Sequence, residues 1–229
     1  MEKRPLVGMV TIGQAPRVDV VPEMADLIGP RAEIVERGAL DGLPRPAIAD
    51  LEPQPGDDVL VTRLADGSSV FLGKQRITPL VQARIDALER DGAAMTVVLC
   101  TGKFVGLRAT RPLIEPERVL QGVLRGVTFR GRLGILTPSA RHVEQTRERW
   151  TSYGFDPVVV PLSPYHGEAR ESEVAAIAET FRDGNVGFVV GDCMGFRRSM
   201  RDGLASALQV PVVVANLLVA RVIAELVGD

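Results

Sequence analysis

The sequence predicts an α/β fold made of two similar lobes, each built around a parallel sheet. Strand-like and helix-like segments alternate along most of the 229 residues, which is the pattern of successive βα units. A hydrophobic content of 45% is enough to bury a core in each lobe. We expect the first lobe over residues 1–115 and the second over 116–214, with a closing helix over 215–229 that packs back on the first lobe.

The first lobe is predicted to begin with a buried strand over residues 6–12, followed by a glycine-containing loop. A helix is expected over 18–28, starting or bending at Pro22, because proline lacks the amide hydrogen that a helix interior needs. A second strand is expected within 32–40. The proline-rich, acidic stretch 41–58 indicates a surface excursion.

The middle of the first lobe carries a hairpin signal. Two β-rich runs in 59–73 flank Asp66-Gly67, a dipeptide that favours a tight turn, so an antiparallel edge is expected there. A helix over about 75–91 follows and leads into an inner strand that ends at Cys100.

The second lobe repeats this scheme, and Ser139 is expected to be the N-cap of its first helix. Strands and helices are predicted to alternate, with strands over 132–138, 156–162, 186–193 and 210–216 and helices over 139–152, 171–183 and 198–208.

Composition narrows the partners and the chemistry. The 27 Lys and Arg residues are scattered among 29 Asp and Glu, so no basic field attracts nucleic acid or an anionic membrane. One Trp and two Tyr residues leave little aromatic surface for stacking bases. A small-molecule partner is therefore expected. The chain length permits a homodimer without requiring one.

The N-terminus has no apolar segment of signal-peptide length, and no run of eighteen apolar residues occurs, so we expect a cytoplasmic protein. The chain has two cysteines, no CxxC pair and only two histidines, His142 and His166, which argues against a metal cluster. A disulfide between Cys100 and Cys193 is unexpected in the cytosol, although the sequence leaves it open.

Both cysteines follow a β-branched run and precede a glycine turn, in VVLCTGK and VVGDCMG. Ligands of open α/β sheets bind beyond the carboxyl ends of the strands, where backbone N–H groups point outward and favour a thiolate. Two facing thiols could take a proton from one face of a carbon acid and return it to the other, so Cys100 and Cys193 are the predicted catalytic pair. The candidate ligand-binding residues are Thr11, Gly13, Gln14, Arg17, Thr101, Gly102, Thr137, Asp192, Met194 and Gly195.

Each of these residues also has a purely structural interpretation. A cysteine at a strand end is often a small core residue. Asp192 either orients a ligand hydroxyl or caps the following helix, and its position favours the cap. Arg17 either clamps a substrate carboxylate or pairs with Asp19 or Glu23.

Two loops in the second lobe also have both a ligand-binding and a purely structural interpretation. The hydroxyl of Thr137 is either a ligand donor or part of a simple strand exit. His166, in the polar stretch SPYHGEA, belongs either to a lid or, as we expect, to a solvated loop.

The segments TIGQAPRVDVVPEM, TRLADGSSVFLGK, GDCMGFRR and VPVVVANLLVARVIAEL resemble the AroM family over nearly the whole chain. That family is similar to the Asp/Glu racemase superfamily, which includes hydantoin racemases, maleate isomerase and arylmalonate decarboxylase. The resemblance implies two pseudo-symmetric, flavodoxin-like lobes with a ligand cleft between them. It also implies cofactor-independent proton transfer, with Cys100 as the first cysteine and Cys193 as the second.

The chain departs from the racemase pattern beside both cysteines. In the racemases the first cysteine is typically followed by Asn-Thr and the second by Thr, whereas Thr101-Gly102 and Met194-Gly195 stand here. A plain amino acid gripped in the usual way is therefore not the expected ligand. We expect a racemase or isomerase acting on a small carboxylate or related carbonyl compound. The alternatives are a one-thiol isomerase or decarboxylase that uses Cys193, and a non-catalytic binding or regulatory protein.

Overall fold

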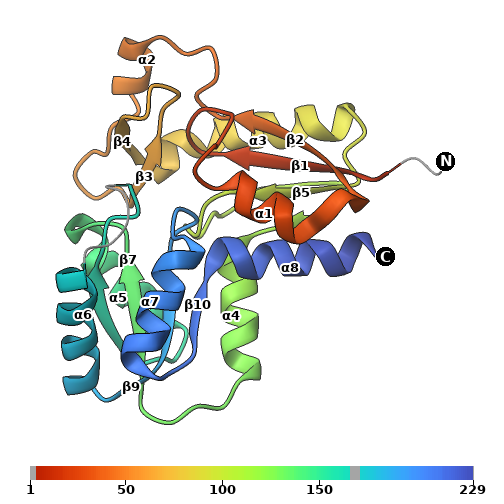
Figure 1. Cartoon of the computed structure of the whole chain (residues 1–229). Coiled ribbons are helices and arrows are strands. Elements are labelled where there is room, and N and C mark those ends of the chain that lie inside the picture. Colours follow the sequence, from red (N-terminus) through yellow and green to blue (C-terminus); the bar gives the residue numbers. More distant parts are fainter. Residues whose placement is uncertain (1–3, 166–170, 229) are drawn as a thin grey trace. The chain divides into compact units, whose positions relative to one another are not determined.

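A computed structural model describes residues 4–165 and 171–228 (Figure 1). The chain forms two compact units: unit 1 comprises Met1–Val119 and Val219–Asp229, and unit 2 comprises Leu120–Leu218. The division falls inside two helices, which are α4 (Pro116–Gly126) and α8 (Ala215–Val227).

Unit 1 contains a four-stranded sheet in which neighbouring strands are parallel. The order is β2-β1-β5-β6, and the two inner strands are apolar and almost wholly buried, as is typical of strands covered on both faces. The strands are β1 (Leu6–Thr11), β2 (Glu33–Gly38), β5 (Met95–Val98) and β6 (Leu113–Ile114).

The helices of unit 1 follow the predicted signals at two places. Helix α1 (Val21–Ile28) begins beside Pro22, where a missing amide hydrogen removes no helical bond. Helix α3 (Lys74–Arg90) buries one apolar side at the spacing of an amphipathic helix, with Ile77, Val81, Ile85 and Leu88. Shorter turns are η1 (Gly29–Arg31) and α2 (Arg45–Ala49).

The predicted hairpin is confirmed, but it is not an edge of the large sheet. Strands β3 (Val59–Arg63) and β4 (Ser69–Gly73) form their own two-stranded antiparallel sheet, and Gly67 in the turn has a φ of +82°. The reason lies in packing, because Leu60 and Leu72 are buried in the core of unit 1. The hairpin is therefore held by apolar contacts rather than by sheet hydrogen bonds.

Unit 2 contains a second four-stranded parallel sheet, in the order β8-β7-β9-β10. The predicted helix over 139–152 begins as a separate 3₁₀ turn. The elements are β7 (Arg132–Thr137), η2 (Ala140–His142), α5 (Val143–Ser152), β8 (Pro157–Pro161), α6 (Glu171–Asp183), β9 (Val186–Gly191), α7 (Arg198–Leu208) and β10 (Val212–Val214).

The two sheets are internal repeats of one another. In both, the strand order is second, first, third, fourth in chain order, so β1 corresponds to β7 and β5 to β9. Backbone hydrogen bonds at the strand ends also match. Leu99 N donates to Val10 O at 2.7 Å in unit 1, as Asp192 N donates to Leu136 O at 2.9 Å in unit 2. Likewise, Ala39 N donates to Thr11 O and Leu162 N to Thr137 O, both at 2.8 Å.

Three elements were not expected from the sequence. Helix α2 lies in the proline-rich excursion, with a proline in its first turn. Strand β6 has two residues, too few to give a periodic signal. Helix α4 begins at Pro116, where we expected only a lobe boundary.

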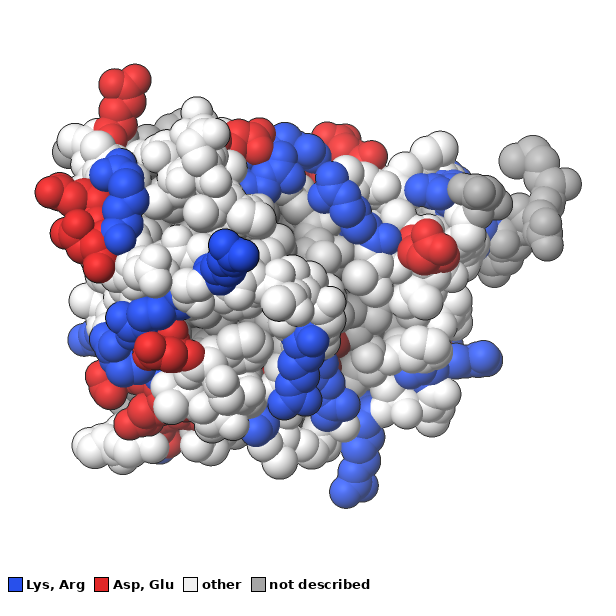
Figure 2. All heavy atoms as spheres, turned by 90° about the horizontal axis from the view of Figure 1, so that it is seen from below, with Lys and Arg blue, Asp and Glu red and all other residues white. Residues whose placement is uncertain are grey.

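Among the described residues, none of the helices combines the length and apolar character needed to cross a bilayer. On the face shown in Figure 2, charged side chains of both signs are dispersed among uncharged residues.

Candidate functional site

The first cysteine turn lies at the carboxyl end of the sheet in unit 1. Strand β5 ends at Val98, so Cys100 is the second residue after the strand rather than its last. Strands β1 and β5 are the neighbours at which the strand order reverses, and this is where open α/β sheets bind ligands. Cys100 therefore follows an inner strand at its carboxyl end, as the sequence predicted.

The backbone folds back on the sulfur of Cys100. The amide of Gly102 donates to Cys100 Sγ at 3.3 Å, an arrangement that favours a thiolate. A Cβ atom on Gly102 would lie 2.9 Å from Leu60 Cδ2 and 3.4 Å from the sulfur. Any side chain at position 102 would thus force Leu60 of the hairpin, which packs against Gly102, to shift. Thr101, which lies between Cys100 and Gly102 in the chain, is buried.

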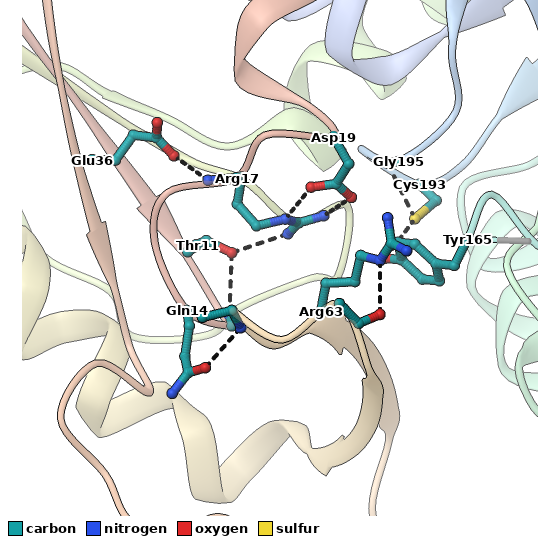
Figure 3. Close-up of polar contacts among 12 residues, drawn as sticks. Thr11, Gln14, Arg17, Asp19, Glu36, Arg63, Tyr165, Cys193 and Gly195 are labelled. Carbon is teal, nitrogen blue, oxygen red and sulfur yellow. Dashed lines mark hydrogen bonds and ion pairs between the residues drawn. The ribbon is translucent and has the colours of Figure 1, made fainter. Parts of the chain in front are cut away.

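Arg17 is committed to an internal carboxylate. Arg17 is 3% exposed. Its guanidinium binds both carboxylate oxygens of Asp19, through Nε at 2.8 Å and Nη2 at 2.9 Å, while Nη1 donates to Thr11 Oγ1 at 3.0 Å (Figure 3). Of the two interpretations of Arg17, the structure shows the ion pair with Asp19, buried rather than on the surface.

The pKa values of the two carboxyl groups in this network, Asp19 and Glu36, shift in opposite directions. Burial alone would raise the pKa of Asp19. The hydrogen bonds and positive charge of Arg17 have a larger, opposite effect, so the pKa lies below its ordinary value. Burial raises the pKa of Glu36, although its carboxylate accepts the backbone amide of Arg17 at 2.7 Å (Figure 3). The pair is therefore anchored to β1 through Thr11 and to β2 through Glu36.

Thr11, Gly13 and Gln14, which we predicted to bind ligand, hold the loop after β1 together. Thr11 Oγ1 also accepts the amide of Gly13 at 3.1 Å. A Cβ atom on Gly13 would lie 2.3 Å from the carbonyl oxygen of Arg63, so its close neighbour is the hairpin. Gln14 Oε1 accepts the amide of Ala65 at 2.8 Å, and its Nε2 donates to the carbonyl of Leu40 at 3.4 Å.

The second cysteine turn repeats the first in unit 2. Cys193 is the second residue after β9, is 8% exposed, and accepts the amide of Gly195 at 3.5 Å. The hydroxyl of Tyr165 lies 3.7 Å from Cys193 Sγ, within the longer reach of hydrogen bonds to sulfur (Figure 3). A Cβ atom on Gly195 would lie 3.1 Å from Tyr165 Cε1. Met194 is buried.

Asp192 does not cap the helix that follows, so that expectation was wrong. Its Oδ2 atom accepts Trp150 Nε1 at 2.8 Å and also pairs with Arg149. Helix α7 has Arg197 at its N-cap, with no side-chain capping bond. The physical reason is burial: Asp192 is 3% exposed, and an enclosed carboxylate needs a cation and donors, which α5 provides.

The end of β7 is also occupied by internal contacts. The hydroxyl of Thr137 is 3.1 Å from that of Thr146. Ser139 is the N-cap residue of η2, as predicted, but its hydroxyl makes no capping bond and lies 2.8 Å from His142 Nδ1. Burial, together with the charges of Arg149 and Arg141, lowers the pKa of His142 to about 4, against the opposing charge of Asp192. His142 is neutral at pH 7.

Sequence reasoning missed Tyr165 as a neighbour of Cys193 and Arg149 as the partner of Asp192. Tyr165 precedes His166 in the polar stretch SPYHGEA, but no pattern in the neighbouring sequence predicts that it contacts a cysteine 28 positions away. The interpretation of His166 itself lies outside the described residues. Within residues 4–165 and 171–228, no group of three or more His, Cys, Asp or Glu side chains could hold a metal ion.

Comparison with known proteins identifies the family. A family model described as AroM protein matches residues 7–227. The chain belongs to the AroM family. None of the curated proteins compared with this AroM-family chain matches it.

Solved structures share the fold of this AroM-family chain at low sequence identity. Allantoin racemase from Klebsiella pneumoniae is 17% identical with a TM-score of 0.67, over 98% of this chain and 88% of the other. An arylmalonate decarboxylase is 15% identical with a TM-score of 0.65, over 98% and 93%. Maleate isomerase Iso from Pseudomonas putida S16 is 12% identical with a TM-score of 0.64, over 95% and 90%. The predicted α/β fold with two parallel sheets is confirmed, and these solved structures share it.

Proposed function

We propose that this AroM-family protein is a cofactor-independent racemase or isomerase that moves a proton on a small carboxylate or related carbonyl compound. The observation that carries the proposal is the repeated turn, in which a thiol follows an inner strand and accepts the amide of a glycine two residues later. Proteins that share the fold include racemases, an isomerase and a decarboxylase, which supports this class of reaction.

The chemistry needs one thiolate and one thiol. The thiolate removes a proton from the carbon next to a carbonyl group, and the electron pair moves into the carbonyl as an enolate. The other thiol returns a proton to the opposite face of that carbon, which inverts the centre. Backbone N–H groups at the strand ends are the donors proposed to stabilise the enolate oxygen. One proton leaves the substrate and one proton returns to it, so the two thiols and the substrate account for every proton that moves.

Arg17 is not the proposed carboxylate clamp. Its guanidinium holds Asp19 through two hydrogen bonds and Thr11 through a third, so a substrate carboxylate would have to compete with Asp19. We propose instead that the substrate carboxylate binds to backbone amides of the two turns.

Exchange in D₂O tests the reaction. The pure protein is incubated with α-amino, α-hydroxy and hydantoin acids, and deuterium at the α carbon is followed by NMR. We expect wash-in with at least one compound, and its loss in both Cys100→Ser and Cys193→Ser. Loss only in Cys193→Ser would support the one-thiol alternative. No exchange with any compound, combined with ligand-induced thermal shifts, would contradict catalysis and favour a binding protein.

The proposal also requires both thiols to reach one substrate. 1,3-Dibromoacetone joins two thiols through three carbon atoms, so it tests this requirement directly. Mass spectrometry should find Cys100 and Cys193 joined within one chain, and a compound that exchanges deuterium should slow the reaction. Modification of each thiol without any bridge would contradict a shared substrate.

A further inference from the structure

The two cysteine turns share a backbone but differ in what packs on their glycines. On Gly102 the neighbour is Leu60, a hydrocarbon side chain from β3, whose Cδ2 would meet a Cβ atom at 2.9 Å. On Gly195 the neighbours are Pro164 and the ring of Tyr165, each of which would meet a Cβ atom at 3.1 Å. Equivalent places in the two repeats thus hold an apolar group in unit 1 and a phenol in unit 2.

The phenol ring is fixed in a way that directs its hydroxyl to the sulfur. The missing side chain of Gly195 lets the ring lie against the turn, and the hydroxyl oxygen then comes to 3.7 Å from Cys193 Sγ (Figure 3). The amide of Gly195 reaches the same sulfur at 3.5 Å. A thiolate accepts such donors more strongly than a neutral thiol does, because the negative charge attracts the donor hydrogens.

The charged groups around Cys193 in unit 2 do not cancel this effect. Asp192, next to it in the chain, is compensated from α5 by the ion pair with Arg149 and by the Trp150 N–H group. His142 is neutral at pH 7, because its pKa is lowered to about 4 by burial and by nearby arginines, against the charge of Asp192. The phenol donor therefore acts beside a carboxylate whose charge is already balanced.

We infer that the Tyr165 hydroxyl donates to Cys193 Sγ and makes Cys193 the resting thiolate, so that Cys193 removes the substrate proton and Cys100 supplies its replacement. This assignment of roles rests on the proposed function. Tyr165 keeps its own proton throughout, and the proton taken by Cys193 comes from the carbon acid. Exchange with solvent then restores the starting protonation of both thiols. In this scheme Tyr165 is a positioning residue for the charge on Cys193.

The inference is tested without a substrate, by titrating thiolate absorbance at 240 nm. The background is Cys100→Ser, which leaves Cys193 as the only thiol. Adding Tyr165→Phe should move the midpoint of thiolate formation upward by about one pH unit, because a hydrogen bond to a charged group is lost. Tyr153→Phe is the matched control, since Tyr153 is the other tyrosine and its ring packs on Trp150. We expect no shift from it.

A second variant protects the test against a change in folding. Gly195→Ala keeps the phenol and the backbone amide but displaces the ring by a few tenths of an ångström, which weakens an already long contact, so it should raise the midpoint by less than Tyr165→Phe does. An unchanged midpoint in both variants, with native circular dichroism, would overturn the inference.

The role as the first base is tested separately by alkylation. With the wild-type protein at pH 7, iodoacetamide followed by peptide mass spectrometry should modify Cys193 before Cys100, and Tyr165→Phe should abolish that preference. Faster modification of Cys100 in the wild type would overturn the assignment of roles. If the titration shift occurs but no compound exchanges deuterium, the proposed function fails while the effect of Tyr165 on Cys193 stands.

Discussion

At the scale of single residues, buried charges in this protein are matched by internal partners. Arg17 with Asp19 and Arg149 with Asp192 are the two clearest pairs, and each lies beside the end of a first or third strand. Each pair contains one candidate ligand-binding residue, Arg17 in the first and Asp192 in the second. At these positions the structure shows how the loops are held, because an enclosed charge without a partner would be costly.

Replacing Asp19 by Asn should destabilise the protein at pH 7 by about 3 kcal/mol, because it leaves the Arg17 charge buried without its carboxylate. The folded-state pKa of Asp19 lies below its ordinary value of 3.8, so its contribution is present above that pH and is lost as the pH falls through the folded pKa. The difference from wild type, measured by urea unfolding, should therefore shrink below about pH 4. Asp26→Asn, on the exposed side of α1, is the control and should change little. An Asp19→Asn variant as stable as wild type at pH 7 would contradict a stabilising pair.

His142 should make the protein sensitive to mild acid. Its pKa is about 4 when folded and 6.5 for a free histidine, so between these values the unfolded chain binds more protons and stability falls as the pH falls. His142→Asn keeps a polar partner for the Ser139 hydroxyl but has no such titration. Urea unfolding between pH 7.5 and 4.5 should show wild type losing roughly 2–3 kcal/mol more than this variant. Parallel curves for the two proteins would contradict a buried neutral histidine.

At the scale of elements, the hairpin β3–β4 fixes the loop after β1. The carbonyl of Arg63 accepts the amide of Gln14 at 3.3 Å, and the amide of Ala65 donates back to the Gln14 side chain. Its sequence signal, Asp66-Gly67, was local and therefore predictable. Its position was not, because the contact with Gly13 depends on where the hairpin packs.

Gly13→Ala should test this packing. The new methyl group would lie 2.3 Å from Arg63 O and 2.4 Å from Thr62 Oγ1, and a backbone carbonyl cannot rotate away as a flexible side chain can. We expect a loss of about 3 kcal/mol in the free energy of unfolding. Gly203→Ala is the matched control, since Gly203 lies inside α7 with no atom near its missing side chain, and it should stabilise the protein by about 0.5–1 kcal/mol. Equal effects of the two changes would contradict a close approach at Gly13.

At the scale of the whole molecule, the sequence predicts the two repeated parallel sheets and their cysteine turns, but it does not predict the long-range side-chain contacts around those turns. The alternation of β-branched runs and amphipathic helices predicted both parallel sheets, and the Cys-x-Gly spacing predicted both turns. The bonds from Trp150 to Asp192 and from Tyr165 to Cys193 span 42 and 28 positions, and they arise only when helices and loops pack on the sheet. Strand β6 has only two residues and is too short for a periodic signal. The apolar residues of α4 do recur at helical spacing, with Leu120 and Leu124 buried, but that pattern was overlooked beside the expected lobe boundary.

The end of the chain belongs to the fold of unit 1. Residues from Val219 onward group with that unit, and Ile223 in α8 is fully buried. Ile223→Ala should lower the free energy of unfolding by about 3 kcal/mol, because a large buried side chain is lost and a cavity remains. Leu226→Ala, on the same helix but 56% exposed, should cost much less. Similar losses for both in thermal unfolding would contradict the burial of this helix.

The hydrogen bond between Trp150 and Asp192 has a practical consequence. Trp150 is the single tryptophan of the chain, and its indole N–H group contacts the residue that precedes Cys193. Indole fluorescence depends on the polarity and charge near the ring. Emission from this protein therefore comes from one known position beside the second cysteine turn, and it offers a label-free optical signal for ligands or reagents that act there.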